Sequence, residues 1–316
     1  MKIAIFPAAG GLGGATLSHL LHTAKVDPSS VVLVSRSPDK LDKEANSGAI
    51  TRKGDFDDPD SLKGAFEGVD ALNLISYPSF QHEHRVKVAK AAIDAAISQG
   101  VKHVFYSSLA FAREGEPTYK PHVMLAHLDT EAYLESLVSP TFSYTIIRQG
   151  LYTESYPIYT ANFNLKEAQA SADKELKIRI PHDGRGPGIP WAKRDELGEA
   201  TANLIAEYDR DPNSFAFINK LIFFTGTKTH SLNDTAAIFS KTVEKNVRIE
   251  SQSVEDYVVR IGVVPKSDSV ELNRRWATAF EAIRHGEAST VTSHLKDYLG
   301  REPEGIEVTY RKMLQG

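Results

Sequence analysis

The chain has 316 residues, of which 41% are hydrophobic and 25% charged, so it can bury the core of one large domain or of a domain with a smaller partner. Its formal net charge of −4 argues against sequence-independent binding of nucleic acid, which needs a basic surface. Because the chain contains no cysteine, disulfides, thiolate catalysis and thiolate metal sites are excluded.

The first residues, MKIAIFPAAGGLGGATLSHLL, allow two interpretations. Lys2 followed by an apolar run faintly resembles a signal peptide, but Pro7 and the glycines of residues 10–14 interrupt the continuous apolar stretch that a signal peptide needs. We therefore interpret this segment as a strand followed by a loop. No part of the sequence approaches the ~20 consecutive apolar residues that cross a bilayer. We expect a soluble, cytoplasmic protein that binds neither membranes nor nucleic acid.

Up to about residue 150, short apolar strands alternate with helical stretches, which is typical of a parallel sheet with helices on its faces. The predicted strands span residues 2–6, 31–35, 49–52, 71–76, 103–107 and 143–148. The predicted helices span residues 14–23, 61–66, 82–99 and 124–137. The third helix is the clearest, because its apolar residues recur at helical spacing and Gly100 supplies a stop. We therefore predict a Rossmann-like, doubly wound α/β fold.

A glycine cluster follows the first predicted strand and precedes the first helix, the context in which such a loop binds a dinucleotide. Glycine lets the backbone approach a pyrophosphate, and the helix N-terminus presents free N–H groups. In a G-x-x-G-x-x-G motif, Gly10 and Gly13 take the second and third positions, and Pro7 stands at the first. Proline has no N–H to donate, although it can make a tight turn with φ of about −65°. We predict that Gly10, Gly11, Leu12 and Gly13 hold a pyrophosphate; the alternative is a glycine-rich connection without a ligand.

The second predicted strand ends in Ser35 and Arg36, and Lys40 follows about one turn later. In this architecture an acidic residue at that strand end holds the ribose 2′-hydroxyl of NAD. Arg36 instead offers a planar fork that suits the 2′-phosphate of NADP, and Ser35 or Ser37 can add a hydroxyl. We predict NADP(H) rather than NAD(H), with Arg36 and Lys40 at the 2′-phosphate; the alternative is a solvent-exposed arginine without a ligand.

Hydride-transferring enzymes of the short-chain dehydrogenase type carry a serine after a later strand and a Tyr-x-x-x-Lys pair on the next helix. The segment FYSSLAF supplies Ser107 and Ser108, but PHVMLAHLDTEAYL has His127 at the lysine position and Val123 at the tyrosine position. The Tyr–Lys proton relay is therefore absent. We predict that His127 orients the cofactor ribose or acts as an acid near neutral pH. The alternative is a histidine on the helix surface or in the cleft without a catalytic role.

After Gly150 the pattern changes. The segment LYTESYPIYTANFN is aromatic and irregular, and IPHDGRGPGIPWAKRDE is rich in glycine and proline, so both predict loops or short elements. Beyond them we predict a helix at 195–208, a strand at 220–225, a helix at 232–243, a strand at 247–250 and further helices within 254–298. We predict a nucleotide-binding domain at residues 1–150, with return segments at about 195–226. Residues 151–194 and 227–316 would form a smaller α/β substrate lobe, with a ligand cleft between the two.

Two further groups of residues are candidates for a site. Five aromatic residues of the irregular region either line a pocket for a flat aromatic substrate or fill the core of the lobe: Tyr152, Tyr156, Tyr159, Phe163 and Trp191. Of these, Tyr152, Tyr156 and Trp191 are our candidates for the substrate pocket. The run His82-Glu83-His84 resembles a metal cluster, but residues two apart on a helix point in different directions, so we predict no metal.

These motifs together resemble the NmrA-like family of atypical short-chain dehydrogenases, in its fungal form, over nearly the whole chain. The resemblance rests on IFPAAGGLGG, SRSPDKL, GDFDDPDSLKGAFEGVDAL, ISYPS, KHVFYSSLA, AHLDTEAYL, IIRQGLY and AKRDELGEA, in that order. KHVFYSSLA and AHLDTEAYL resemble the quinone oxidoreductase and triphenylmethane reductase branch, which also lacks the Tyr–Lys pair. The resemblance implies that Asp55 and Phe56 contact the adenine and that Ser76, Tyr77 and Pro78 flank the ribose.

The resemblance also implies a function. The family includes NADPH-dependent reductases of quinones, dyes, enones or imines, among them enzymes of fungal secondary metabolism, and dinucleotide-binding regulators that act through protein partners. We expect an NADPH-dependent reductase that passes hydride directly to a conjugated, aromatic small molecule. Ser107, Ser108 and His127 would lie at the nicotinamide, with Ser108 and His127 as catalytic candidates. The alternative is a non-catalytic NADP(H) sensor. The sequence leaves a homodimer open.

Overall fold

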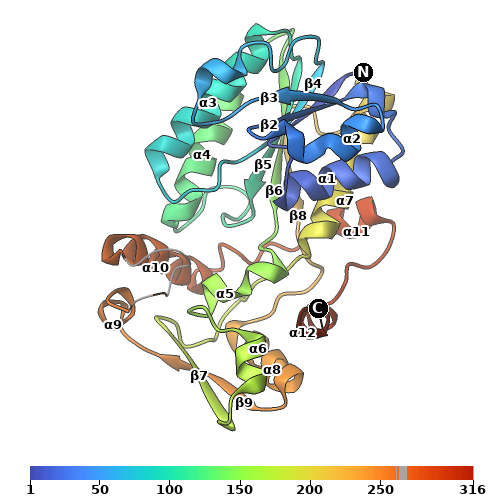
Figure 1. Ribbon diagram of the computed structural model, residues 1–316. Coiled ribbons are helices and arrows are strands. Elements are labelled where there is room, and N and C mark those ends of the chain that lie inside the picture. The colour runs from blue at the N-terminus through green and yellow to red at the C-terminus, as the bar shows by residue number, and fades with distance from the viewer. Residues whose placement is uncertain (261, 263–268, 316) are drawn as a thin grey trace.

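A sheet of seven parallel strands forms the centre of the larger part of the molecule (Figure 1). The computed structural model describes residues 1–260, 262 and 269–315. The strands are β1 (Ile3–Phe6), β2 (Val31–Ser35), β3 (Ile50–Lys53), β4 (Ala71–Ile75), β5 (His103–Leu109), β6 (Ser143–Gln149) and β8 (Lys220–Phe224). Their order is β3-β2-β1-β4-β5-β6-β8, so successive strands are added outward in opposite directions from the β1–β4 pair. In such sheets a ligand crevice opens at this switch point, beyond the carboxyl ends of the strands.

Helices cover both faces of this sheet. On one face α1 (Gly11–His22), α7 (Arg194–Arg210) and α11 (His294–Leu299) pack together, and on the other α3 (His82–Ser98) packs on α4 (His122–Ser136). A short helix, α2 (Asp42–Asn46), lies between β2 and β3 in the chain. Helices α1 and α7 approach closely because a Cβ on Gly198 would lie only 2.5 Å from the Cβ of Ala15. Strands β1 and β2 are buried along their whole length, which explains their continuous apolar sequences.

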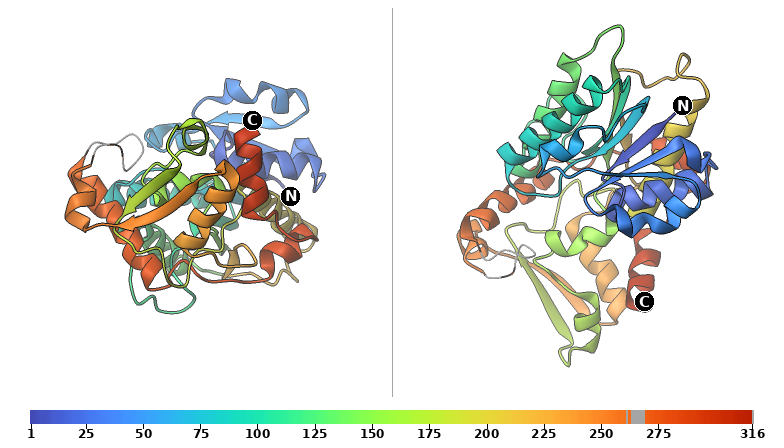
Figure 2. Two further views of the ribbon diagram at one scale, coloured as in Figure 1. Left: turned by 90° about the horizontal axis from the view of Figure 1, so that it is seen from below. Right: turned by 45° about the horizontal axis from the view of Figure 1, so that its top comes forward.

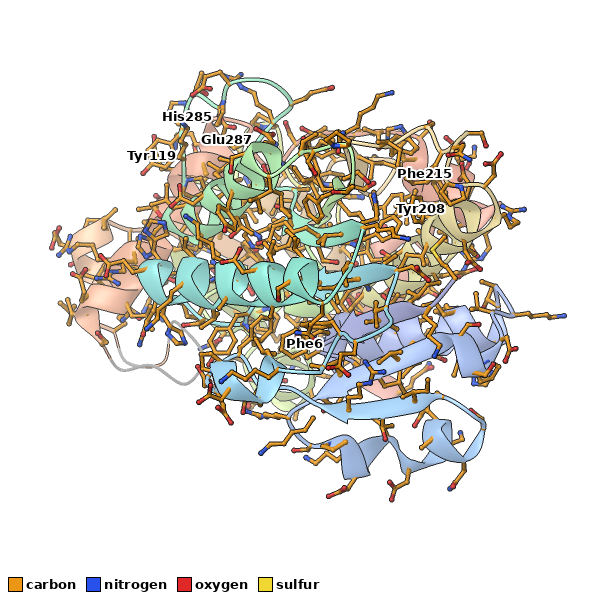
Figure 3. All side chains as sticks on the ribbon, turned by 90° about the horizontal axis from the view of Figure 1, so that it is seen from above. Phe6, Tyr119, Tyr208, Phe215, His285 and Glu287 are labelled. Carbon is orange, nitrogen blue, oxygen red and sulfur yellow. The ribbon has the colours of Figure 1, made fainter. Side chains whose placement is uncertain are left out.

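An aromatic cluster closes the end of the sheet where β5 begins, opposite the crevice. The ring of His103 stacks on Tyr208 with centroids 4.3 Å apart, and Phe215 meets both rings edge-on. Figure 3 labels Tyr208 and Phe215, which come from the end of α7 and the segment after it. The two nitrogens of His103 pair with Ser143 Oγ at 2.8 Å and Thr145 Oγ1 at 3.0 Å. Burial lowers the pKa of His103 to about 3, so this histidine is neutral in the folded protein.

A smaller lobe lies beyond the carboxyl ends of the large sheet. In Figure 1 and in the right-hand view of Figure 2 it lies below that sheet. It contains a two-stranded parallel sheet of β7 (Glu175–Ile180) and β9 (Asn246–Ser251). Its helices are α5 (Tyr156–Tyr159), α6 (Leu165–Ala170), α8 (Leu232–Val243), α9 (Val254–Val258), α10 (Val270–Arg284) and α12 (Ile306–Gln315). Helix α8 begins with a capping box in which Ser231 and Asp234 bond to each other's backbone N–H.

The predicted α/β fold is confirmed, with local differences. The helix predicted at 61–66 is a short 3-10 turn at Pro59–Leu62, because Pro59 and Gly64 leave too few residues for a helix. Strand β7 and helix α12 were not predicted. Residues 294–299 were predicted in the lobe, whereas α11 packs against α7 and β8 of the larger part. Some of the residues predicted as helices within 254–298 lie outside the described residues. Among the helices that the structure describes, none is long and apolar enough to cross a membrane.

Candidate functional site

A cleft of about 330 Å³ lies between the large sheet and the lobe. Its floor comes from the ends of β4 and β5 and from α4, and its walls come from the segments after β1 and β6 and from α10. Leu12 of the glycine loop lies at one end, and Trp276 of α10 is part of the lobe wall. The cleft therefore connects the predicted pyrophosphate loop with an aromatic wall, at the switch point of the sheet.

The glycine loop has the geometry of an anion cradle. Gly10 and Gly11 have φ values of 72° and 49°, and α1 begins directly after Gly10 without a side chain capping its free N–H groups. A Cβ on Gly13 would lie 2.1 Å from the carbonyl oxygen of Pro7, so only glycine lets α1 approach the loop this closely. The Phe6–Pro7 peptide bond is cis. Open space at Gly10 and Gly11 and the uncapped helix end fit a dinucleotide pyrophosphate.

The residues predicted for the adenine end lie at the carboxyl ends of β2 and β3. Arg36 and Lys40 are exposed and, within the described part of the chain, form no ion pair, so both are available to a phosphate. Ser35 Oγ accepts a hydrogen bond from the N–H of Ser37 at 3.1 Å. Asp55 is half-buried, whereas the Phe56 ring is 5% exposed and stacks on Phe6 with centroids 4.2 Å apart. Because the Phe56 ring is buried and one of its faces is covered by Phe6, only the edge of the ring and the backbone of Phe56 can contact an adenine.

Asp57 is a residue of this end that the sequence did not single out. It accepts hydrogen bonds from Tyr77 Oη at 2.7 Å and from His84 Nε2 at 2.8 Å. These bonds, that from Tyr77 above all, and the charge of nearby Arg36 hold the pKa of Asp57 below its usual range. Tyr77, whose ring also meets Phe56 edge-on, is thereby fixed between the adenine end and the cleft. Ser76 and Pro78 line the cleft beside it.

The two serines at the end of β5 differ in their surroundings. Ser108 Oγ donates to Glu131 Oε1 at 2.5 Å, and Glu131 also pairs with Arg148 through its Oε2 at 2.7 Å from Nη2. This ion pair is almost completely buried, and Arg148 Nη1 donates to the carbonyl of Ala112. Ser107 Oγ is buried and has no hydrogen-bond partner among the described residues. Both serines line the cleft, but only Ser107 has a free hydroxyl for a ligand.

His127 lines the cleft with only 6% of its surface exposed. Its Nε2 lies 2.7 Å from Arg85 Nη2, and its Nδ1 lies 3.2 Å from Tyr106 Oη. Because the guanidinium can only donate, Nε2 is the acceptor and Nδ1 carries the proton. Burial, followed by the charges of Arg85 and Arg148, lowers the pKa of His127 well below its usual value. The expectation of an acid near neutral pH is corrected accordingly: this imidazole is neutral, and a role in orienting the cofactor stays a prediction.

Arg85 is the second residue that the sequence did not single out. It is 5% exposed, lines the cleft, and donates to Val123 O at 2.8 Å and Ser76 Oγ at 3.0 Å. A signal was present in the sequence: Arg85 precedes Val88, Ala89 and Ala92 at spacings of three, four and seven, so it lies on the buried face of α3. A charge on the apolar face of a helix indicates either a buried ion pair or a functional site.

The aromatic candidates separate into wall and core. Tyr152 and Tyr159 line the cleft, together with Trp276, whose ring meets Tyr159 at 5.3 Å. Tyr156 lies in the core of the lobe, where it packs against Phe239 and Tyr310. Trp191 and Phe163 also pack into that core, and Trp191 Nε1 donates to Thr235. Of the three residues predicted for the substrate pocket, only Tyr152 lines the cleft. Tyr156 and Trp191 lie in the core of the lobe, and the cleft wall contains the aromatic residues Tyr159 and Trp276 instead.

A buried carboxylate holds the lobe against the segment that joins β5 to α4. Glu287, which is fully buried, accepts hydrogen bonds from the N–H of Arg113, Thr118 and Tyr119 and from Thr118 Oγ1. Burial alone raises the pKa of Glu287, but these bonds together hold it below its usual value. The ring of Tyr119 stacks on that of His285; both residues are labelled in Figure 3. The same segment follows β5, which carries Ser107 and Ser108, and leads into α4, which carries His127, so this anchor helps to fix the cleft.

The histidines at the start of α3 serve different partners. His82 Nε2 lies 2.6 Å from Asp129 of α4, whereas His84 bonds to Asp57. Among the described residues, no group of three or more His, Asp or Glu side chains is placed to hold a metal ion.

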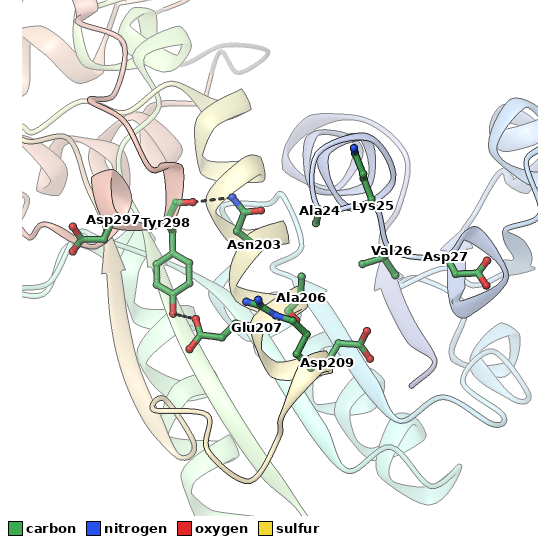
Figure 4. Close-up of a pocket in the computed structure, with 11 residues that line it drawn as sticks. Ala24, Lys25, Val26, Asp27, Asn203, Ala206, Glu207, Asp209, Asp297 and Tyr298 are labelled. Atoms are coloured by element: carbon green, nitrogen blue, oxygen red, sulfur yellow. Dashed lines mark hydrogen bonds between the residues drawn. The ribbon is translucent and has the colours of Figure 1, made fainter.

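A second hollow lies at the opposite end of the sheet. It is enclosed by helix α7, by helix α11 and by the loop that follows α1 (Figure 4). Two of its polar side chains have partners within it: Tyr298 Oη donates to Glu207 at 2.7 Å, and Asn203 donates to the backbone carbonyl of Tyr298 at 2.8 Å. Asp209 pairs with the N-terminal ammonium group of Met1. This hollow lacks both a glycine loop and the strand ends, so the cleft is the candidate site.

A model of the NmrA-like family matches residues 1–298 of the chain. An oxidoreductase of Aspergillus flavus with an NmrA-like family domain is 25% identical over 325 residues, which cover 99% of this chain and 95% of that protein. Quinone oxidoreductase 2 of Escherichia coli is 29% identical over 268 residues, 85% of this chain and 84% of that protein. The structure of triphenylmethane reductase from Citrobacter aligns over the whole of both chains with 25% identity and a TM-score of 0.79. That of the Escherichia coli quinone oxidoreductase with NADPH aligns over 99% of both, with 24% identity and a TM-score of 0.78.

Proposed function

The chain belongs to the NmrA-like family, and on this premise we propose that it is an NADPH-dependent oxidoreductase that passes hydride directly to a conjugated acceptor such as a quinone, an enone or an imine. One observation carries the proposal: a single cleft runs from Leu12, in the first turn of α1 beside its free N-terminus, past the ends of β4 and β5 to an aromatic wall. The names of the matched relatives, an oxidoreductase and a quinone oxidoreductase, support the same class of reaction.

The residues of the glycine loop and of the strand ends each bind a different part of the cofactor. The backbone of residues 10–13 holds the pyrophosphate, and Arg36 and Lys40, both exposed and without an ion-pair partner among the described residues, hold the 2′-phosphate. Asp55 and Phe56 contact the adenine. NADPH bound in this way supplies a hydride at C4 of its nicotinamide.

The other end of the cleft orients the ribose, the nicotinamide and the acceptor. Ser76, Tyr77 and Pro78 flank the ribose, and Ser107, with its unpartnered buried hydroxyl, donates to or accepts from the nicotinamide amide or ribose. Ser108 and His127 lie beside the nicotinamide. Because each is already bonded to a protein partner, they orient the cofactor and do not transfer a proton. The acceptor lies against Tyr152, Tyr159 and Trp276, whose flat apolar surfaces exclude water from the reacting atoms.

The test is to follow the absorbance of NADPH with a panel of quinones, enones and imines, and to measure NADPH binding in parallel by calorimetry. We expect tight binding and turnover of at least one class of acceptor. Among the described residues that line the cleft, none is a charged proton donor, since His127 is neutral and Ser108 is bonded to Glu131, and this also fits a non-catalytic NADP(H) sensor. Binding without turnover across the panel would favour that sensor and contradict the reductase.

A further inference from the structure

Arg85 is the only side chain with a formal charge among the described residues that line the cleft. Every other lining residue is apolar, an alcohol, a phenol or an indole, apart from His127, which is neutral. The charged pair Glu131–Arg148 lies behind Ser108, and its two charges cancel. The cleft therefore has a net positive potential that originates from one guanidinium.

The guanidinium has no counter-ion among the residues that the structure describes. Its contacts are Val123 O, Ser76 Oγ and His127 Nε2, all uncharged acceptors, and its Nε has no hydrogen-bond partner among the described residues. No carboxylate of the described residues forms an ion pair with it. Burial without such a partner also lowers its pKa from the usual value, although an arginine stays charged at neutral pH.

These contacts do not need a positive charge. Val123 O and Ser76 Oγ could be bonded as well by a neutral amide, and an unpaired charge that is nine-tenths buried is costly to fold. Arginines buried for structure alone normally face a carboxylate, as Arg148 faces Glu131 behind Ser108. The missing negative charge is therefore expected to come from a bound molecule.

We propose that Arg85 is an oxyanion-binding residue, and that the cleft selects neutral carbonyl acceptors, whose oxygen becomes negative, over cationic acceptors. This proposal rests on the reductase function proposed above and narrows its acceptor class. A C–H bond at C4 of the dihydronicotinamide breaks, and its hydrogen and both electrons pass to the acceptor, leaving NADP⁺. A quinone or an enone thereby becomes a hydroquinone anion or an enolate, whose oxygen Arg85 stabilises until water supplies one proton.

The sign of the charge distinguishes two kinds of acceptor. A neutral quinone gains one negative charge in the transition state, so a fixed buried cation lowers its barrier. An iminium ion or a triarylmethyl cation loses its positive charge when it accepts hydride. The guanidinium of Arg85 therefore repels such a substrate and does not stabilise its neutral product. The cleft thus favours quinones and enones within the set of acceptors that the proposed function allows.

The first experiment compares the Arg85→Met, Arg85→Lys and wild-type proteins with a naphthoquinone and with a cationic triarylmethane dye. The exposed Lys87→Met serves as the matched control on the same helix. We expect Arg85→Met to lower kcat/KM for the quinone by about 100-fold, the usual loss of one oxyanion donor, and Arg85→Lys to restore part of it. For the dye, kcat/KM should stay unchanged or rise. Equal losses with both acceptors, or no loss with the quinone, would overturn the proposal.

A second measurement needs no variant and no turnover. Para-nitrophenol is titrated in the presence and absence of the wild-type protein saturated with NADP⁺, and its ionisation is followed by the absorbance of the phenolate. Stabilisation of the oxyanion should lower the pKa of the bound phenol by about one unit or more, a tenfold preference for the phenolate. An unshifted pKa, or no binding at millimolar concentration, would contradict the subsite. A shift without NADPH turnover would instead retain the subsite and refute the reductase.

Discussion

Replacing Gly13 with alanine tests the link between the first turn of α1 and the cofactor site. A Cβ on Gly13 would lie 2.1 Å from Pro7 O, whereas ordinary contact begins at 3.4 Å, so the helix and the loop must separate by up to 3.4 − 2.1 = 1.3 Å. A Cβ on the next residue, Gly14, would meet nothing nearer than Ala8 O at 4.0 Å. Both substitutions add the same methyl group to the same helix, so the gain in helix propensity of about 1 kcal/mol applies to both and cancels.

The difference between the two variants therefore isolates the clash. We expect the free energy of unfolding of Gly13→Ala to be lower than that of Gly14→Ala by about 1–3 kcal/mol, the usual cost of overpacking. Because the displaced backbone carries the N–H groups that we propose to hold the pyrophosphate, NADPH should also bind Gly13→Ala about 10-fold more weakly or worse. Urea unfolding and calorimetric titration with NADPH measure the two effects. Equal unfolding midpoints for the two variants would refute the close approach of α1 to the loop.

Three further results are expected. Arg36→Glu should weaken NADPH binding by about 10- to 100-fold, because a charge-assisted hydrogen bond to the 2′-phosphate is lost. The binding of NADH, which lacks this phosphate, should be nearly unchanged. Equal losses for the two cofactors in calorimetry would show that Arg36 does not bind the 2′-phosphate. Glu131→Ala should lower the free energy of unfolding by about 3–5 kcal/mol, because it leaves a buried guanidinium unpaired, whereas the exposed Glu135→Ala on the same helix should have little effect in urea unfolding. His103, whose pKa is lowered to about 3, binds its proton more tightly when unfolded, so stability falls as the pH drops from about 6.5 towards 3. Between pH 7 and 5 the wild type should lose about 2 kcal/mol more than His103→Gln, and parallel losses would show that His103 is not neutral in the folded state.

The parts of the fold that the sequence predicted are those in which one local pattern decides the structure. Strands β1, β2 and β4 are buried on both sides, so their sequences are continuous apolar runs that few other elements share. The glycine loop was found for a similar reason, because the φ values of Gly10 and Gly11 and the close approach at Gly13 require glycine locally.

Elements that depend on distant partners were missed. Strand β7, with the sequence ELKIRI, alternates exposed charges with apolar residues that are buried or half-buried, and it is stabilised by pairing with β9, some seventy positions later in the chain. Nothing within residues 175–180 specifies that partner. The short helix α12 is likewise held by its contacts with α6 and α8.

The site divides in the same way. Which residues lie near the strand ends followed from the order of the motifs, but their protonation states and partners did not. The neutral state of His127 depends on its burial in the assembled fold and then on Arg85 from another helix. The aromatic wall depends on Trp276, which reaches the cleft because α10 packs against α4. A histidine or a tryptophan in a sequence carries no information about such contacts. Arg85 itself was detectable as a charge on the apolar face of α3.

The central claim is direct hydride transfer from NADPH, and isotope transfer tests it most directly. NADPH deuterated at C4 in the transferred position is incubated with the protein and a cyclic enone, and the product is examined by mass spectrometry and NMR. The account predicts one deuterium at the β-carbon of the reduced product and none at the α-carbon, which takes its hydrogen from water. A reduced product without deuterium, or no consumption of NADPH with any of the quinones, enones and imines, would contradict it.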